Sequence, residues 1–329
     1  MRKNFYITSK TPLRISFFGG GTDVDYFYKR LGGKVISTAI NKYVYVTVKS
    51  QNIFFEENYR LNYSKTERVD KIKNIQNKII KECLKYTKIK SKIYISTVSD
   101  IPDSTGLGSS SAFTVGLLKA LYEAKNEKKT NIELAKIAST IEIKKVKSPI
   151  GKQDQYACAL GDFNIINFNT NGSVKIKKIH NRKFIKNLFS KSCLVWTGKY
   201  KKTSKILADQ KKNFKTNLKN LKEILNIATR VSKKVVLRNY SINDFKLSLQ
   251  KSWFLKKNLS KKILNKNINN IIKKFENNTR SAYKILGAGG GGFLFITGGD
   301  HKNIVKKNKF TILNVKSVRN GSEIIYKNY

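Results

Sequence analysis

Between a run typical of a β-strand and a run typical of a buried helix, the sequence reads Pro102-Asp103-Ser104-Thr105-Gly106-Leu107-Gly108-Ser109-Ser110-Ser111-Ala112. Glycines let backbone N–H groups turn inward toward an anion, and the following helix presents free amides and the positive end of its dipole. The stretch therefore predicts a phosphate-binding loop. Its serine hydroxyls can cap the helix and also face a metal ion bound to phosphate oxygens. On spacing alone, a purely structural loop stays open, and no Walker pattern occurs in the chain.

A second glycine cluster reads Leu286-Gly287-Ala288-Gly289-Gly290-Gly291-Gly292-Phe293. It contains a G-x-G-x-x-G pattern but leads into a strand-like run instead of a helix, so we reject a dinucleotide-binding interpretation. So many glycines cost chain entropy, which predicts a close backbone approach to another loop or to a ligand. Gly289 and Gly290 are therefore candidate substrate-binding residues, and a flexible structural turn is the alternative.

A third segment lies near the N-terminus and reads Thr11-Pro12-Leu13-Arg14-Ile15-Ser16-Phe17-Phe18-Gly19-Gly20-Gly21-Thr22-Asp23. It predicts a strand that enters a glycine turn. Arg14 on the strand suits a phosphate group, and Asp23 just past the turn suits hydroxyl groups. The segment is weak evidence by itself, because Thr-Asp after glycine is also a common turn end.

In this order along the chain, the three segments resemble the motifs of the GHMP kinases, a family that includes galactokinase, homoserine kinase and mevalonate kinase. Residues 102–112 are similar to the family's P-x-x-x-G-L-G-S-S-[SA], residues 14–23 to its first motif and residues 287–293 to its third. The first motif, with residues 151–156 and 161–164, is most similar to the subgroup that phosphorylates the anomeric hydroxyl of sugars. Within this subgroup, the chain is most similar to D-glycero-D-manno-heptose 7-phosphate kinases, and fucokinase is the nearest alternative.

The resemblance implies ATP and Mg²⁺ as cofactors, with the triphosphate over the phosphate-binding loop. Ser110 matches a hydroxyl that helps to hold Mg²⁺, and Glu142, in the helix before Ser148-Pro149, matches the metal-ligand carboxylate. The implied ATP-binding residues are Gly106, Leu107, Gly108, Ser109, Ser110 and Ser111.

The resemblance also implies a catalytic pair. Asp154 matches the family's acidic residue near the acceptor hydroxyl, and Arg14 matches an arginine that neutralises charge beside it. The loop before Asp154 is one residue longer after its glycine than the family's usual P-x-G-x-D. The sequence does not decide whether Asp154 accepts the hydroxyl proton or only orients the attacking oxygen.

Sugar binding is implied for Arg14 again and for Asp23, which matches a carboxylate that grips sugar hydroxyls. Galactokinases have Glu and His where this chain has Gly20 and Gly21, which should leave room for a larger or differently oriented sugar. Lys152 is the candidate for the acceptor's own phosphate, with a solvent-facing lysine as the alternative. A departure at Tyr283, where relatives often have glycine, leaves the shape of the third loop open. Thr22 and Gln153 complete the implied substrate-binding set.

Composition limits the chemistry. Three scattered cysteines and two histidines argue against a disulfide framework, a thiolate zinc site and imidazole catalysis. Catalysis must therefore use carboxylates, Arg/Lys, hydroxyls and backbone amides. No apolar run is long enough to span a membrane, and the first ten residues are too polar for a signal peptide. We expect a cytoplasmic protein with no membrane partner.

The formal net charge of +46 raises a protein of another class, one that binds nucleic acid or another polyanion and whose glycine loops are only structural. Only ten of the 67 basic residues are arginine, and the lysines are spread along the chain as an A/T-rich genome would produce. No RNP1-like motif, zinc finger or aromatic-interleaved arginine tract supports that class. We therefore expect a small sugar phosphate as the partner, not nucleic acid, and leave a homodimer open.

The apolar pattern predicts an α+β chain of two domains. Strands are expected within 13–17, 43–48, 93–98 and 163–168 and helices over 112–122 and 132–145, with three more helices around residues 214–228, 245–253 and 268–275. We place the boundary near residues 170–190, giving an N-terminal domain (1–180) with the ATP loop and catalytic residues and a C-terminal domain (181–329) with the third motif. The resemblance implies a ribosomal-protein-S5-like domain and a ferredoxin-like α/β sandwich, with ATP and sugar in the cleft between them.

Altogether, the implied reaction transfers a phosphoryl group from ATP to heptose 7-phosphate. The product would be the 1,7-bisphosphate, on the way to nucleotide-activated heptose for surface polysaccharide such as capsule or lipopolysaccharide.

Overall fold

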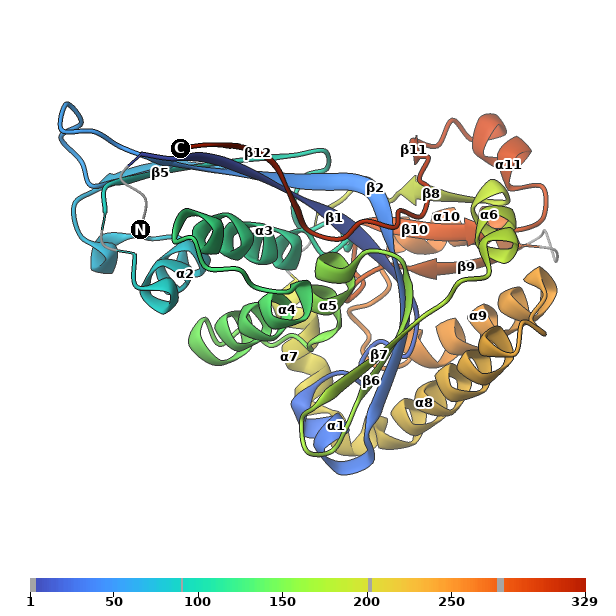
Figure 1. Cartoon of the computed structure of the whole chain (residues 1–329). Coiled ribbons are helices and arrows are strands. Elements are labelled where there is room, and N and C mark those ends of the chain that lie inside the picture. Colours follow the sequence, from blue (N-terminus) through green and yellow to red (C-terminus); the bar gives the residue numbers. More distant parts are fainter. Residues whose placement is uncertain (1–3, 90, 201–202, 277–280) are drawn as a thin grey trace.

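Within residues 4–89, 91–200, 203–276 and 281–329, which the computed structural model describes, two β-sheets organise the chain (Figure 1). The larger sheet has the order β12-β1-β2-β5-β3-β4, with β6 also paired to β2 and β7 to β6. Its strands are β1 (Tyr6–Phe18), β2 (Gly33–Ser50), β3 (Tyr59–Asn62), β4 (Thr66–Val69), β5 (Ile93–Ser99), β6 (Phe163–Phe168), β7 (Val174–Lys178) and β12 (Glu323–Asn328). The smaller sheet has the order β11-β8-β10-β9, formed by β8 (Ser192–Trp196), β9 (Ala282–Ile285), β10 (Phe293–Thr297) and β11 (Ile312–Leu313).

The long hairpin of β1 and β2 is the frame of the larger sheet. The two strands pair antiparallel from Tyr6 opposite Lys49 to Phe18 opposite Ile36, with irregularities after Pro12 and after Ser16. On its other edge, β2 pairs first with β6 and then with β5. All four predicted strands are confirmed, and those over 93–98 and 163–168 match β5 and β6 closely. β1 and β2 are longer than expected, because the register shifts interrupt the apolar alternation without ending the pairing.

The helices of the first half are α1 (Asp25–Leu31), η1 (Ile72–Asn74), α2 (Lys78–Thr87), α3 (Ser109–Ala124), α4 (Asn131–Ser139) and α5 (Gln153–Leu160). α5 packs on β1 and β2, and α2 and α4 pack on α3. α3 lies against β1 and β2 (Figure 1). A Cβ on its Gly116 would come within 2.8 Å of the Thr11 hydroxyl, so a glycine is needed where helix and strand cross. The helix expected over 132–145 is α4 followed by a π-helical turn, η2 (Thr140–Lys145), which carries Glu142.

Helices of the second half are α6 (Arg182–Ser190), α7 (Thr203–Lys212), α8 (Phe214–Val236), α9 (Ile242–Lys257), α10 (Lys266–Glu276) and α11 (His301–Lys307). The three predicted helices are confirmed as α8, α9 and α10. The apolar stripe of α8 is buried against α9 and β2, and α9 packs on β9. α8 and α9 therefore connect the smaller sheet to the end of the β1–β2 hairpin.

The predicted α+β class is confirmed, but the C-terminal end departs from the predicted boundary. After the smaller sheet, the chain returns and β12 pairs antiparallel with β1 in the larger sheet (Figure 1). The two parts also share apolar packing: the ring of Phe17 lies 5.4 Å from Phe163, 5.3 Å from Phe245 and 5.2 Å from Phe295. Sequence periodicity could not reveal this, because it reports local structure and not which sheet a strand joins.

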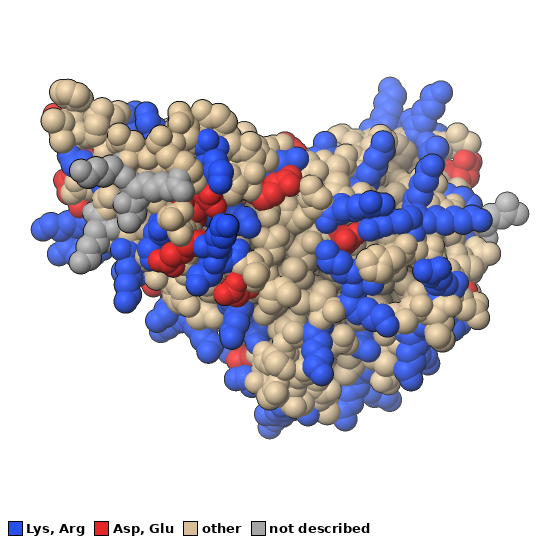
Figure 2. All heavy atoms as spheres, in the orientation of Figure 1, with Lys and Arg blue, Asp and Glu red and all other residues tan. Residues whose placement is uncertain are grey.

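Basic side chains are scattered over the visible face and form no single stripe on it (Figure 2). Among the described residues, no helix combines the length and apolar character needed to cross a membrane.

Candidate active site

A cavity of about 310 Å³ lies where the first glycine turn, the phosphate-binding loop, the start of α5 and the helices α7 and α9 meet. Both parts of the chain contribute to its wall. The predicted site residues that line it are Arg14, Gly20, Gly21, Asp23, Gly106, Gly108, Ser109, Ser110, Ser111, Glu142, Gln153 and Asp154. These residues are spread over 141 positions of sequence, and the fold brings them to one place.

Arg14 and Asp154 form a two-point ion pair in this cavity. Arg14 Nε donates to Asp154 Oδ1 at 2.8 Å and Nη2 donates to Oδ2 at 2.6 Å. The third guanidinium nitrogen, Nη1, donates to the carbonyl of Gly106 at 2.6 Å. Burial alone would lower the pKa of Arg14, but the Asp154 carboxylate reverses this and raises it. The guanidinium therefore stays charged and fixes the carboxylate beside the phosphate-binding loop.

Asp23 is a second carboxylate, 2% exposed, at the end of the first glycine turn. It accepts hydrogen bonds from the backbone N–H of Gly21 (3.1 Å) and from the backbone and side-chain nitrogens of Gln153 (3.2 and 3.0 Å). Ser16 donates to the side-chain oxygen of Gln153 at 2.6 Å and so fixes the amide. Burial raises the pKa of Asp23, and the negative charge of Asp154 raises it further.

Glu142 is the third carboxylate, and the π-helical turn η2 holds it 1% exposed. Its Oε1 accepts from the Ser110 hydroxyl at 2.8 Å, and its Oε2 accepts from Ser111 (2.8 Å) and Gln155 (2.6 Å). Burial raises the pKa of Glu142, and these three hydrogen bonds oppose the shift. Insertion of one residue into a helical turn is frequent at functional sites, and here it orients Glu142 toward the start of α3.

The Glu142 cluster fits a magnesium ion. Two neighbouring ligands of octahedral Mg²⁺, each at about 2.1 Å, lie about 3 Å apart, close to the 2.8 Å between Ser110 Oγ and Glu142 Oε1. Mg²⁺ is usually held by one or two carboxylates together with substrate phosphates. In the described part of the chain, no group of three His, Cys, Asp or Glu side chains could hold a metal by itself.

The phosphate-binding loop requires glycine at two positions. Gly106 and Gly108 have φ of +85° and +81°, a region that side chains disfavour. Gly108 is also the N-cap of α3, and within the described residues no side-chain cap is found for this helix. The expectation that a loop serine caps α3 is therefore wrong: Ser110 and Ser111 donate to Glu142 instead. The first-turn amides of α3 are left without a side-chain acceptor at the cavity wall.

The third glycine motif approaches this loop through its backbone, as expected. A Cβ on Gly287 would meet Gly106 Cα at 2.7 Å, and one on Gly292 would meet the Thr105 carbonyl at 2.2 Å. Gly289 and Gly290, in contrast, do not line the cavity. Gly290 donates to the Ile263 carbonyl at 2.8 Å, and Gly289 packs on the same residue. The motif thus supports the phosphate-binding loop from behind.

Three other predicted residues point elsewhere. The Lys152 ammonium donates to the Gly172 carbonyl at 3.1 Å and lies 4.6 Å from the centre of the Tyr28 ring. The Thr22 hydroxyl is buried in the glycine turn, where it donates to the Gly19 carbonyl at 2.8 Å. The Leu107 side chain belongs to the core, and its carbonyl accepts from the Arg14 N–H at 2.9 Å.

Sequence reasoning missed several residues of the wall and one buried residue next to it, Gln155. Ser16 and Gln155 lie inside stretches that were singled out, but only the folded chain shows that they orient Gln153 and Glu142. The α7 face that lines the cavity, and Lys256 at the end of α9, gave no signal, because each lies in a lysine-rich helix far from any motif. The α7 residues in question are Thr203, Ser204, Leu207 and Gln210.

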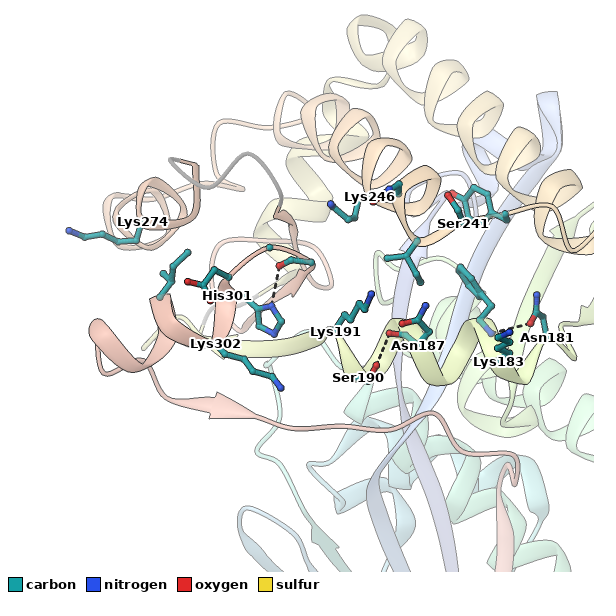
Figure 3. A pocket seen from close by; sticks show the side chains of 18 residues that line it. Asn181, Lys183, Asn187, Ser190, Lys191, Ser241, Lys246, Lys274, His301 and Lys302 are labelled. Atoms are coloured by element: carbon teal, nitrogen blue, oxygen red, sulfur yellow. Dashed lines mark hydrogen bonds between the residues drawn. The ribbon is translucent and has the colours of Figure 1, made fainter.

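A second, larger hollow of about 1450 Å³ lies between α6, α9, α10 and α11 (Figure 3). Its wall includes five lysines and a single carboxylate, Asp300. The labelled side chains of Lys274 and Lys302 point away from its middle, and His301 hydrogen-bonds the Gly298 carbonyl at 3.0 Å (Figure 3). Its wall lacks the close pairing of opposite charges found in the smaller cavity, so we assign the chemistry to the cavity at Asp154.

Comparisons with known proteins agree with this geometry. The family described as "GHMP kinases N terminal domain" matches residues 74–162. D-glycero-alpha-D-manno-heptose 7-phosphate kinase of Campylobacter jejuni is 30% identical over 302 residues, which cover 88% of each chain. The chain therefore belongs to the GHMP kinase family. Members of this family are ATP-dependent kinases, so the chain is a phosphotransferase with an alcohol group as acceptor.

Other relatives agree on the fold. The crystal structure of a D-glycero-D-manno-heptose 1-phosphate kinase from Bacteroides thetaiotaomicron superposes with a TM-score of 0.79 at 22% identity and covers 98% of this chain and 99% of its own. Mevalonate kinase of Methanococcus jannaschii gives 0.70 at 25% identity, covering 95% and 98%. Galactokinase of Thermotoga petrophila is 30% identical over 46% of this chain and 43% of its own.

Proposed function

We propose that this kinase transfers a phosphoryl group from ATP to the anomeric hydroxyl of D-glycero-D-manno-heptose 7-phosphate and forms the 1,7-bisphosphate. The observation that carries the proposal is the ion pair of Arg14 and Asp154, which places a fixed carboxylate beside the phosphate-binding loop. The heptose acceptor is supported by the Campylobacter jejuni relative, which matches along most of both chains.

Asp154 is proposed to receive the acceptor hydroxyl. Phosphoryl transfer places charge on the oxygens of the moving group, so positioning and electrostatics do most of the work. Asp154 lines the cavity and is held at both oxygens by Arg14. It can accept the hydroxyl proton as the new P–O bond forms and the bond to the ADP oxygen breaks, while Arg14 holds the carboxylate in place and faces the phosphate oxygens.

The nucleotide is proposed to lie with its triphosphate on the amides of residues 106–110. Glu142 and Ser110 would hold Mg²⁺ between them, as the 2.8 Å separation of their oxygens allows. When bound, the metal neutralises charge on the phosphate oxygens. The hydrogen bonds from Ser111 and Gln155 orient the Glu142 carboxylate for this role.

The sugar is proposed to bind between the first glycine turn and the start of α5. Asp23 would accept hydrogen bonds from sugar hydroxyls, and Gln153 would contribute its amide. At Gly20, a Cβ would meet no atom closer than 3.8 Å, so this wall is open on the cavity side. Gly289, Gly290 and Lys152 are not part of this proposal, because none of the three lines the cavity.

We place the enzyme in the cytoplasm, where ATP is available and thiols stay reduced, since its three cysteines are all free and buried. The division into an N-terminal and a C-terminal domain is kept as a proposal for residues up to β11, with β12 assigned to the first part. A homodimer also stays a prediction, which light scattering can test.

ADP release tests the acceptor. Heptose 7-phosphate, unphosphorylated heptose, fucose and galactose are each offered with ATP and Mg²⁺. We expect turnover with heptose 7-phosphate and an acid-labile product phosphate, since an anomeric phosphate hydrolyses readily in acid. Preference for fucose would indicate a fucokinase. Steeply salt-dependent DNA binding without ATP turnover would favour the polyanion-binding class instead.

A further inference from the structure

Lys256, in the last turn of α9, is a buried cation whose role no motif explains. It is 8% exposed, and its ammonium donates to the carbonyls of Gly287 (2.5 Å) and Ile285 (3.3 Å) in the third glycine motif. Among the described residues, no carboxylate forms an ion pair with it. A buried charge held by carbonyls alone is costly unless an anion is brought to it.

The position of Lys256 indicates which anion this is. Its side chain lines the same cavity as Arg14, Asp23 and Asp154. The residue that it holds, Gly287, abuts the backbone of Gly106, and Gly106 in turn accepts the hydrogen bond from Arg14. Lys256 therefore lies on the cavity wall beside the third glycine motif, together with Arg14 and Asp154.

Charged groups from several segments lie near Lys256: Arg14, Asp23, Asp154 and Lys284. Burial lowers the pKa of Lys256 to about 7, and the positive charge of Arg14 on β1 adds to the effect, while Asp154 and Asp23 oppose it. Lys284 on β9 is a second buried lysine that repels it. Lys284 donates to the carbonyls of Ser16 and Phe17. A phosphate oxygen arriving at Lys256 would counter this accumulation of positive charge.

We propose that Lys256 contacts the phosphoryl group that is transferred, using the N–H that Gly287 and Ile285 leave free. The inference rests on the proposed function for its site but not for the identity of the sugar. Together with Arg14, Lys256 encloses the terminal phosphate of ATP from two sides. Because it also holds the third glycine motif, it couples the shape of that loop to the presence of the terminal phosphate.

Calorimetric titration with a non-hydrolysable ATP analogue and with ADP tests this, since only the first carries the terminal phosphate. Lys256→Met should weaken analogue binding by about tenfold or more, as loss of a hydrogen bond to a charged group predicts, and leave ADP binding within about twofold. Lys256→Arg should recover much of the loss. Lys257→Met, next on the same helix and partly exposed, is the matched control and should change neither affinity.

Two results would overturn the proposal. If Lys256→Met weakened the binding of the analogue and of ADP equally, Lys256 would only hold the third motif in place. Unchanged nucleotide binding with a raised KM for a phosphorylated sugar alone would assign it to the acceptor's own phosphate. The comparison needs no sugar turnover, so a wrong heptose assignment leaves it intact. If the chain did not bind the analogue at all, the proposed nucleotide site would fail first.

The pH dependence gives an independent readout. The protonated lysine binds the anion, and a bound phosphate raises its pKa, so analogue affinity in the unsubstituted enzyme should fall as pH rises above about 7. In Lys256→Met this part of the pH dependence should be missing. Identical pH profiles for the two proteins would contradict a contact between Lys256 and the phosphate.

Discussion

The cavity at Asp154 and the lysine-lined hollow between α6 and α11 are two candidate sites of the molecule. Ranked by volume and positive charge alone, the hollow would come first. The hollow is several times larger, about 1450 against 310 Å³, and its wall is rich in lysine. The smaller cavity has carboxylates and cations that bond one another, with Asp154 gripped at both oxygens and Glu142 accepting three hydrogen bonds. Convergent, mutually fixed groups mark a catalytic site better than volume or net charge.

The high net charge makes buried carboxylates a better marker of a functional site than lysines. In a chain with 67 basic residues, a hollow lined by several lysines is expected from their number alone, and basic side chains are scattered over the visible face (Figure 2). Acidic residues number only 21, so their burial close together is informative. Asp23 and Glu142 are both buried, and each is oriented by side chains from another segment of the chain.

Substitution of Asp154 should have the largest effect. Asp154→Asn removes the carboxylate that is proposed to receive the acceptor proton, and kcat should fall by roughly two orders of magnitude or more, while nucleotide binding persists. Steady-state kinetics and an ATP-analogue titration measure the two quantities. Asp25→Asn, an exposed residue that pairs only at 4.0 Å with Lys29, is the control. Near-normal turnover by Asp154→Asn would remove this residue from the mechanism.

The glycine turns allow a sharper comparison inside the cavity. At Gly106, φ is +85° and a Cβ would lie 2.7 Å from the Leu286 carbonyl oxygen. Gly106→Ala should therefore lower the free energy of unfolding by about 1–3 kcal/mol and weaken ATP binding. At Gly20, a Cβ would meet no atom closer than 3.8 Å, so Gly20→Ala should leave the melting temperature unchanged or raise it slightly. Similar melting temperatures for the two variants would show that the loop is not held as described.

Glu142→Gln tests the metal site. Loss of the carboxylate charge should raise the Mg²⁺ concentration for half-maximal activity by about tenfold or more. The control is Glu133→Gln on α4, where the carboxylate is exposed and caps its own helix. An Mg²⁺ titration identical to that of the unsubstituted enzyme would reject Glu142 as a ligand.

Removal of charge from the larger hollow should have the smallest effect. Lys191→Met with Lys246→Met deletes two of its lysines, and we expect kcat and both KM values to stay within about twofold. A large loss of activity in this double variant would mean that the hollow takes part in catalysis, and the contrast drawn between the two regions would be wrong.

Much of the fold and of the candidate site could be predicted from the sequence. The resemblance located Arg14, Asp23, Glu142 and Asp154, because the motifs are local and follow the family's order, although the loop before Asp154 is one residue longer. The strands β1, β2, β5 and β6 and the helices α3, α4, α8, α9 and α10 followed from apolar periodicity, whereas α1, α2, α6, α7 and α11 were not predicted. The family resemblance also pointed to the cavity between the two parts.

Other features depend on contacts between distant segments, which periodicity does not report. β12 returns to β1 across more than 300 residues of sequence. The π-helical turn at Glu142 looks like ordinary helix in the sequence. Lys152 was chosen because it is next to Gln153 and Asp154 along the chain, yet its ammonium turns to Gly172. Lys256 is hidden among many lysines and is recognised only by its burial.

A crystal structure with Mg²⁺ and a non-hydrolysable ATP analogue would show whether the nucleotide binds in the cavity at Asp154. The triphosphate should lie on the amides of residues 106–110, with the metal between Glu142 and Ser110 and the terminal phosphate facing Arg14. A nucleotide bound in the lysine-lined hollow, with the cavity at Asp154 empty, would contradict the account.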